Sequence, residues 1–311
     1  MLKLVSKSSG IKLLEYSYPN IGKNDVLIET IGSCYSKGTE YSTVKNHQRS
    51  IIQKVIENQS KIVDLIQKKD FKTLFKKLNE QKTSTINLGY SASGKVLAIG
   101  ESVRDIKIGD MVVSLGSSAN HSQYSVVPNG LCIKIGNEVD PLQASSAAIA
   151  SIALNSVLLA NPLIGSKALV IGCGLIGQFI IQFLNISGVE STSVDIDYSK
   201  KEQSLLHGSN SFLSLEEFHQ ANISNEFENV FIVTPSIEKE LWELIGNNSK
   251  SNSNIVMVGA ADLNCPREIF YKKQLNFISP HSYGPGRGLY DFEILGKDFP
   301  KFSQTWDLRS N

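Results

Sequence analysis

Three glycines and one aspartate form the clearest chemical pattern in this sequence. Gly172, Gly174 and Gly177 follow the apolar run 168–171, and Asp195 stands 18 positions after the last glycine. Glycines at this spacing between a strand and a helix let the backbone approach a pyrophosphate, which the helix N-terminus attracts. An acid about 20 residues further on accepts hydrogen bonds from the adenosine ribose. The pattern therefore predicts a dinucleotide-binding site.

The aspartate also bears on which dinucleotide binds. A carboxylate at the end of the second strand repels the 2′-phosphate of NADP, so Asp195 favours NAD over NADP. Asp197 is a second candidate for this position, and we interpret it as a solvated acid that opens the next turn. Leu175 and Ile176 begin the expected helix, so their N–H groups join the glycines in the predicted pyrophosphate site.

The elements that must position this motif alternate along the second half of the chain. Apolar, β-branched runs typical of buried parallel strands lie at 168–171, 191–196, 230–234 and 254–259. Segments with helical spacing fall between them, at 175–186 and 239–245. This alternation predicts an α/β domain with a doubly wound parallel sheet, a Rossmann domain, over residues 144–311.

The first half of the chain has a different pattern. Short strand-like runs separated by turn residues predict a mostly antiparallel β domain over residues 1–143. Within it, the lysine-rich stretch 45–82 has helical spacing, and we interpret it as an insert of two solvated amphipathic helices. A helix pair that docks a partner or an anionic surface is the alternative. A long alanine-rich helix is expected from Asp140 to about Ala160.

Composition excludes several classes of protein. A chain of 311 residues with net charge +1 and 41% hydrophobic residues is typical of a folded two-domain protein, not of a disordered or nucleic-acid-binding one. Its four cysteines are far apart and form no C-x-x-C pair, which argues against disulfides and structural zinc. The N-terminus does not resemble a signal peptide. We interpret the apolar stretch 168–189 as strand, turn and buried helix, and expect a cytoplasmic protein without a membrane span.

Motifs outside the glycine pattern follow a specific order. G-E-S-V and G-D-M-V at 100–112 and Y-S-V-V-P at 124–128 precede an alanine-rich helix and the Rossmann motif. This order resembles the medium-chain dehydrogenase/reductase superfamily, the alcohol-dehydrogenase-like proteins, and implies a GroES-like β domain before the Rossmann domain. Four more stretches resemble the N-terminal half of bacterial bi-domain oxidoreductases linked with polysaccharide synthesis, and they lie at 36–40, 88–91, 265–271 and 282–287.

The resemblance implies cofactor contacts beyond the glycine turn. Lys200 is expected near the adenosine end of the cofactor. Two later strand ends are expected against the adenosine and the nicotinamide amide, and they consist of Val233 and Thr234, and of Val258, Gly259 and Ala260. These positions agree with ligand binding at the carboxyl ends of parallel strands.

The zinc positions of the superfamily have changed in this chain. Zinc-dependent members place a cysteine before a Gly-Thr-Asp phrase and a His-Glu pair after a later glycine. This chain has Lys37 at the first position and Tyr90 and Ser91 at the second, while Cys34 stands three residues too early to substitute. We therefore predict that the protein holds no catalytic metal.

Without a metal, another group must polarise a substrate carbonyl. Thr39 matches the hydroxyl that relays the substrate proton in zinc-dependent members, and Tyr90 and Lys37 are candidate acids or electrophiles. Their structural alternatives are a helix cap, core packing and a solvated turn, respectively. Two further candidates for substrate binding are His121, in a loop, and Arg287, whose guanidinium on a Gly-Pro-Gly loop suits a carboxylate or phosphate.

These features leave three functions open. The first is a zinc-independent, NAD-linked oxidoreductase acting on an alcohol/carbonyl pair of a small-molecule substrate, such as a sugar or nucleotide-sugar. The second is a quinone or enoyl reductase, since those relatives also lack zinc. The third is a non-catalytic NAD-binding subunit or degenerate remnant that docks a partner. Members of the superfamily return to the β domain near the position where this chain ends, so we expect either a truncated product or a homo-oligomer or partner chain that supplies the missing part.

Overall fold

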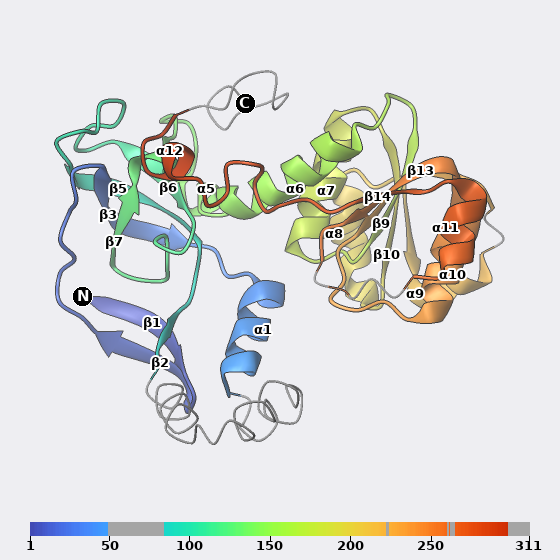
Figure 1. The fold of residues 1–311 in the computed structure, drawn as a ribbon, viewed down its shortest axis with the longest axis horizontal. Coiled ribbons are helices and arrows are strands. Elements are labelled where there is room, and N and C mark those ends of the chain that lie inside the picture. The colour runs from blue at the N-terminus through green and yellow to red at the C-terminus, as the bar shows by residue number, and fades with distance from the viewer. Residues whose placement is uncertain (49–83, 222–223, 260, 262–264, 298–311) are drawn as a thin grey trace, which may run out of the picture. The chain divides into compact units, whose positions relative to one another are not determined.

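The computed structural model describes residues 1–48, 84–221, 224–259, 261 and 265–297. Its contacts divide the chain into two compact units (Figure 1), Met1–Ala148 with Gly288–Asn311, and Ile149–Arg287. Most of the lysine-rich insert expected at 45–82 lies outside the described residues. Ala260 and the C-terminal residues 304–311 do so as well.

The division differs from the expected one at the end of the chain. The sequence assigned everything after residue 143 to the Rossmann domain, whereas the described residues 288–297 group with the first unit. Helix α12 (Tyr290–Glu293) packs against the short 3₁₀ turn Asn129–Leu131. Gly130 makes this approach possible, because a Cβ there would stand 1.9 Å from the Phe292 carbonyl oxygen.

The first unit is built on antiparallel sheets, as expected. A five-stranded sheet has the order β7-β3-β5-β6-β8, and a three-stranded sheet has the order β2-β1-β4. The strands are β1 (Leu2–Lys7), β2 (Gly10–Glu15), β3 (Asp25–Ser33), β4 (Ile86–Asn87), β5 (Ser91–Ile99), β6 (Met111–Leu115), β7 (Tyr124–Pro128) and β8 (Cys132–Lys134). The strand β3 is an inner strand of the larger sheet, between β7 and β5.

A helix follows β3 closely. The helix α1 (Lys37–Gln48) begins after three intervening residues, within the Ser-Lys-Gly-Thr-Glu phrase. Its far end is attached to β1 by His47, whose Nδ1 lies 3.0 Å from Ser6 Oγ and whose Nε2 lies 3.0 Å from Ser84 Oγ. Both ends of α1 are therefore held by the first unit.

The alanine-rich region contains two helices, so the single helix expected from Asp140 is wrong in this respect. The helix α5 (Pro141–Ala144) ends before α6 (Ala147–Ala160) begins. At the break, the Ser145 and Ser146 hydroxyls donate to the carbonyls of Leu142 and Gln143 at 2.7 and 2.8 Å. Serine hydroxyls that bond nearby backbone groups compete with helical hydrogen bonding, which explains the interruption.

The second unit is a parallel six-stranded sheet with the order β11-β10-β9-β12-β13-β14. The strands are β9 (Lys167–Ile171), β10 (Glu190–Asp195), β11 (Ser211–Ser214), β12 (Phe227–Ile232), β13 (Ser249–Met257) and β14 (Asn276–Ile278). The helices are α7 (Leu175–Ile186), α8 (Lys201–Leu206), α9 (Leu215–Gln220), α10 (Lys239–Asn248) and α11 (Arg267–Lys273). None of the described helices is long and apolar enough to cross a membrane.

Helices cover both faces of this sheet (Figure 1). Ala168 and Val170 of β9 pack in one buried cluster with residues of α6 and α7. Leu169 and Ile171 pack in a second cluster with residues of α9 and α10, including the fully buried Trp242. Because alternate residues of one strand enter opposite clusters, the sheet is doubly wound, as the sequence predicts.

One lysine stabilises the end of α10. The Lys273 ammonium donates to the carbonyls of Gly246, Asn247 and Ser249 at 2.7, 2.8 and 2.7 Å. We expect Lys273→Met to lower the free energy of unfolding by roughly 1–2 kcal/mol, because charge-assisted bonds to these carbonyls are lost. In the control Lys272→Met, which breaks only an exposed pair with Glu268, the midpoint of urea unfolding should stay nearly constant. Equal midpoints for the two variants would contradict the capping role.

Candidate functional site

The glycine turn lies between β9 and α7. Gly172 has φ +97°, a conformation that favours glycine, and a Cβ at Gly177 would stand 2.0 Å from the Gly172 carbonyl oxygen. Gly174 is different, because no heavy atom of the described chain lies within 4 Å of the position its Cβ would take. The turn is thus closely packed at Gly172 and Gly177 and open at Gly174, where a ligand could approach the backbone.

The open turn leads directly into the N-terminus of α7. Gly174 is the N-cap residue, and neither a capping side chain nor an acid in the first turn neutralises this helix end within the described residues. Leu175 and Ile176 form the first turn together with the buried Gly177. An uncapped helix N-terminus carries a partial positive charge and N–H donors, which suit a phosphate group.

Asp195 ends β10, the strand next to β9. Its Oδ2 accepts a hydrogen bond from the Cys173 N–H at 2.6 Å, and its Oδ1 accepts one from the Asp197 N–H at 2.8 Å. A carboxylate oxygen has two acceptor positions, so both oxygens can still accept ribose hydroxyls. Asp197 accepts from the Ser199 N–H at 3.1 Å and lies 3.9 Å from the Lys200 ammonium, at the start of the next turn.

The later strand ends meet the glycine turn at the carboxyl edge of the sheet. The Cβ position of Gly172 lies 3.1 Å from Thr234 Cγ2, and that of Gly259 lies 2.2 Å from the Thr234 carbonyl oxygen. Val233 and Val258 donate backbone hydrogen bonds to the strand ends at Ile171 and Ile232. The predicted residues Val233, Thr234, Val258 and Gly259 therefore lie at the same edge as the glycine turn, and Ala260 is not described.

A buried polar network supports the turn and was not expected from the sequence. The Gln178 amide nitrogen donates to the Cys173 carbonyl at 3.1 Å and to the Ser204 hydroxyl at 2.9 Å. His207 Nδ1 lies 2.8 Å from Gln178 Oε1. A glutamine and a serine at buried helical positions were the only sequence signal of this network.

The Cys173 thiol gives this region a specific pH dependence. Burial raises the pKa of Cys173 to about 11, so the folded protein keeps a proton that the unfolded chain loses near its ordinary value of 9.0. Stability should therefore fall as pH rises from about 9 to about 11, by roughly 2–3 kcal/mol from this group. Urea unfolding of wild type and Cys173→Ala between pH 8 and 11 isolates the contribution, since other groups cancel. Parallel pH profiles for the two proteins would contradict the prediction.

The predicted catalytic residues lie in the first unit, around the start of α1. Lys37 and Thr39 are exposed in the first turn of α1, and Tyr90 is half-buried directly before β5. Within the part of the chain that is described, none of these three side chains makes a hydrogen bond. The described residues thus give these three side chains no hydrogen-bond partner that would activate them.

His121, unlike Lys37, Thr39 and Tyr90, has side-chain hydrogen-bond partners among the described residues. Its Nε2 lies 2.9 Å from Glu40 Oε2, and its Nδ1 lies 2.8 Å from Ser33 Oγ. Glu40 is 3% exposed, and its other oxygen accepts from the Ser36 N–H at 2.9 Å. The sequence singled out His121 as a substrate ligand, and the structure adds Ser33 and Glu40, which the sequence analysis missed.

Gly89 makes room for this histidine. It has φ +90°, and a Cβ at this position would stand 2.7 Å from the His121 backbone nitrogen and 2.8 Å from its Nδ1. The imidazole therefore lies against the turn that precedes Tyr90. Tyr90, the residue after Gly89, was expected where zinc-dependent members have a histidine. The imidazole next to this turn is instead that of His121.

Arg287 is the other predicted substrate-binding residue. Arg287 is exposed, and its guanidinium lies 5.9 Å from the ring centroid of the buried Tyr283. The loop that carries Arg287 is attached to α6, because the Asn155 amide donates to the Ser282 carbonyl at 3.0 Å.

Cys34 directly follows β3, and burial together with the Glu40 charge raises the pKa of its thiol. Among the described residues, no three histidines, cysteines or acids are arranged to hold a metal.

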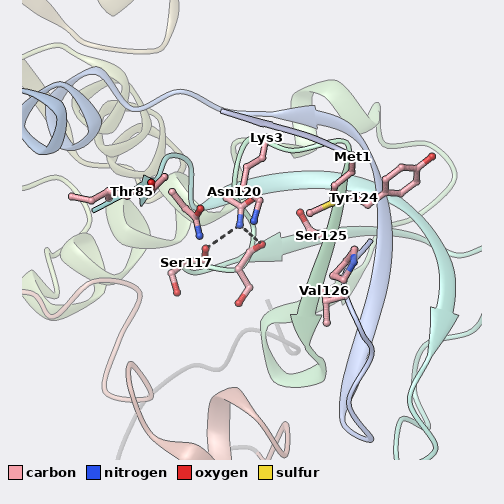
Figure 2. A pocket seen from close by; sticks show the side chains of 12 residues that line it. Met1, Lys3, Thr85, Ser117, Asn120, Tyr124, Ser125 and Val126 are labelled. Atoms are coloured by element: carbon pink, nitrogen blue, oxygen red, sulfur yellow. Dashed lines mark hydrogen bonds between the residues drawn. The ribbon is translucent and has the colours of Figure 1, made fainter. Parts of the chain in front are cut away.

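The first unit also has an open pocket of about 580 Å³ (Figure 2). Lys3, Ser117, Asn120 and Tyr124 are among the residues around it, and none of the predicted site residues lines it. Figure 2 shows the Asn120 amide bonded to the carbonyls of Ser117 and Ser118, at 3.4 and 3.1 Å. This pocket is therefore separate from the His121 group.

Comparison with known proteins identifies the fold. No family model matches the chain. Over 131 residues it is 28% identical to (R,R)-butanediol dehydrogenase of Bacillus subtilis (strain 168), which covers 34% of this chain and 38% of that protein. The match thus spans well under half of that relative. Galactitol-1-phosphate dehydrogenase from Escherichia coli superposes with a TM-score of 0.70 at 15% identity, covering 91% of this chain and 83% of that one. The fold is that of the medium-chain dehydrogenases.

Two other solved structures with this medium-chain dehydrogenase fold contain a cofactor. A protein named a short chain alcohol dehydrogenase, from Escherichia coli CFT073 and complexed with NADH, matches with a TM-score of 0.69 at 17% identity, covering 92% of this chain and 85% of that one. A protein named a zinc-binding dehydrogenase, from Sinorhizobium meliloti 1021 and bound to NADP, matches with a TM-score of 0.69 at 14% identity. The match covers 95% of this chain and 89% of that one. The expected pairing of a GroES-like and a Rossmann domain is confirmed. Identities this low establish the fold and not the activity.

Proposed function

We propose that this protein is a zinc-independent, NAD-linked oxidoreductase that acts on an alcohol/carbonyl pair. The observation that carries the proposal is the open glycine turn at the uncapped N-terminus of α7, with Asp195 on the neighbouring strand end. A dinucleotide fits this donor set, because its pyrophosphate would meet the backbone at Gly174 and its ribose would meet the carboxylate. Bound there, NAD supplies a hydride acceptor.

Asp195 supports NAD as the preferred cofactor. Its two oxygens are held by backbone N–H groups of Cys173 and Asp197, so the carboxylate cannot easily turn away from a 2′-phosphate. We expect wild type to bind NADH at least about tenfold more tightly than NADPH, and Asp195→Asn to reduce that preference severalfold because a like-charge repulsion is removed. Fluorescence titration with both cofactors measures the ratio. Asp197→Asn is the control, and an equal effect of the two variants would contradict the role of Asp195.

The residues at the former zinc positions support zinc independence. An ammonium at Lys37 and a phenol at Tyr90 replace the thiolate and imidazole that bind zinc tightly. The related proteins are described as acting on butanediol and galactitol 1-phosphate. We therefore propose a polyol, a sugar or a nucleotide-sugar as the substrate, and Arg287 as a candidate group for its phosphate.

The decisive experiment combines binding with turnover. The purified chain is titrated with NADH, and NADH consumption is then followed with aldehydes, ketoses, nucleotide-sugars, quinones and enones, before and after dialysis against a zinc chelator. We expect saturable binding and turnover of a sugar-type carbonyl that survives chelation. Loss of activity on chelation, restored by zinc, would overturn zinc independence. Binding without any turnover would instead support a non-catalytic NAD-binding subunit.

A further inference from the structure

A serine, a histidine and a glutamate form one hydrogen-bonded chain in the first unit. Ser33 Oγ lies 2.8 Å from His121 Nδ1, and His121 Nε2 lies 2.9 Å from Glu40 Oε2. Solvent exposure falls from the serine to the glutamate. Ser33 is exposed, while the side chains of His121 and Glu40 are 11% and 4% exposed. A hydroxyl at the surface is thus connected to a buried carboxylate through one imidazole.

The local structure fixes each member of this chain. Ser33 is the last residue of β3 and pairs with Ala92 of β5. Glu40 is in the first turn of α1, where the helix N-terminus favours its negative charge. The His121 backbone N–H donates to the Leu88 carbonyl at 2.8 Å, which holds the imidazole against Gly89. Three separate segments therefore fix the position of one imidazole.

Such a chain suits proton transfer better than nucleophilic attack. An imidazole that donates to a carboxylate can take a proton at its other nitrogen, because the carboxylate stabilises the resulting imidazolium. Acyl transfer also needs N–H donors for an oxyanion next to the nucleophile. The N–H of Cys34, the residue after Ser33, already donates to the Ser91 carbonyl at 2.9 Å. The expected donor for an oxyanion is therefore engaged.

We propose that Ser33, His121 and Glu40 form a proton relay that takes the place of a metal in the hydride-transfer reaction. The inference rests on the proposed function. During alcohol oxidation, the substrate hydroxyl proton passes to Ser33 Oγ while the Ser33 proton passes to His121 Nδ1. The electron pair of the broken O–H bond then forms the second carbon–oxygen bond of the carbonyl, and NAD⁺, when bound, would accept the carbinol hydride with its electron pair. The proton then returns through the exposed Ser33 hydroxyl to water, and carbonyl reduction follows the reverse path.

In this scheme the three residues have different roles. Ser33 contacts the substrate and is the catalytic residue, whereas His121 and Glu40 act through it as positioning and proton-holding residues. The Cys34 thiol is a further titratable group close to the relay, since burial and then the Glu40 charge raise the pKa of Cys34. Because Cys34 stays protonated through the neutral range, it does not compete with His121 for the transferred proton.

The experiment uses the full chain with NADH and a carbonyl substrate that wild type reduces. We expect Ser33→Ala to lower kcat roughly 10²-fold with little change in NADH affinity, as for the loss of a general acid–base group. Ser42→Ala is the matched control, because its exposed hydroxyl bonds only the Gly38 carbonyl within α1. His121→Ala should lose a similar factor, and added imidazole should restore part of its kcat. No such rescue is expected for His47→Ala, whose imidazole bonds the hydroxyls of Ser6 and Ser84 at the far end of α1.

A second readout does not depend on turnover. In protein with ¹⁵N-labelled histidine, Ser33→Ala should shift the His121 Nδ1 resonance and Glu40→Gln should shift the Nε2 resonance. A wild-type kcat in Ser33→Ala, or unchanged ring resonances in both variants, would overturn the relay alone. A wild type that binds NADH and reduces none of the carbonyls contradicts the proposed function instead. Covalent labelling of Ser33 by a phosphonate reagent would show that Ser33 acts as a nucleophile, and this result would also overturn the relay.

Discussion

Gly174→Asp is expected to abolish NADH binding and leave the fold intact. Gly174 has φ −70°, which any residue adopts, and no described heavy atom lies within 4 Å of its Cβ position. A carboxylate there would occupy the place of the pyrophosphate and repel its charge at the N-terminus of α7. We expect the dissociation constant, measured by fluorescence titration, to rise at least about 10²-fold, with a thermal midpoint close to that of wild type.

Two neighbouring variants separate loss of binding from loss of structure. Gly174→Ala adds only a methyl group to the same open space, so it should weaken NADH binding far less than the aspartate does. Gly177→Ala should lower the thermal midpoint instead, because its Cβ would stand 2.0 Å from the Gly172 carbonyl oxygen. Normal NADH affinity in Gly174→Asp would place the cofactor elsewhere and would remove the main support for the proposed function.

The cofactor half of the site was predictable because its residues are close in sequence. The strand, turn and helix around Gly172, Gly174 and Gly177 are set by short-range patterns, and Leu175–Ile186 forms the expected helix. Asp195 reaches the turn because β10 pairs with β9 in parallel, which the alternation of strands and helices already implies. Local patterns therefore predicted both the fold of this unit and the proximity of the residues proposed to bind the cofactor.

The β-domain half was not predictable in the same way. Glu40 and His121 are 81 positions apart, and no periodicity or spacing rule connects a helix residue with a loop histidine at that distance. Ser33 was hidden as the last residue of an ordinary strand. The break between α5 and α6 was missed because it depends on hydroxyl contacts of Ser145 and Ser146, which compete with an alanine-rich helical pattern. Side-chain contacts between residues that are far apart in the sequence can be identified only from the structure.

Gly89→Ala is expected to disable the first unit's site without affecting cofactor binding. Its positive φ disfavours alanine, and the new Cβ would stand 2.7 Å from the His121 backbone nitrogen and 2.9 Å from Cγ of the ring. His121 must then move, which breaks its bonds to Ser33 and Glu40. Strain of this kind costs about 1–3 kcal/mol, so the free energy of unfolding should fall by at least about 1 kcal/mol. We expect kcat to fall roughly as far as in His121→Ala.

Gly38→Ala is the matched control for Gly89→Ala, because both positions lie close to the same candidate residues. A Cβ at Gly38 has no described heavy atom within 4 Å, and the residue is in α1, where alanine is preferred to glycine. It should therefore stabilise the protein by up to about 1 kcal/mol and leave kcat unchanged. Urea unfolding should show a loss of stability for Gly89→Ala and a gain for Gly38→Ala. Steady-state kinetics should show a lower kcat for Gly89→Ala alone, and NADH titration should show the wild-type affinity for both. A Gly89→Ala protein with wild-type kcat would mean that the position of His121 does not matter for turnover, whatever its hydrogen bonds.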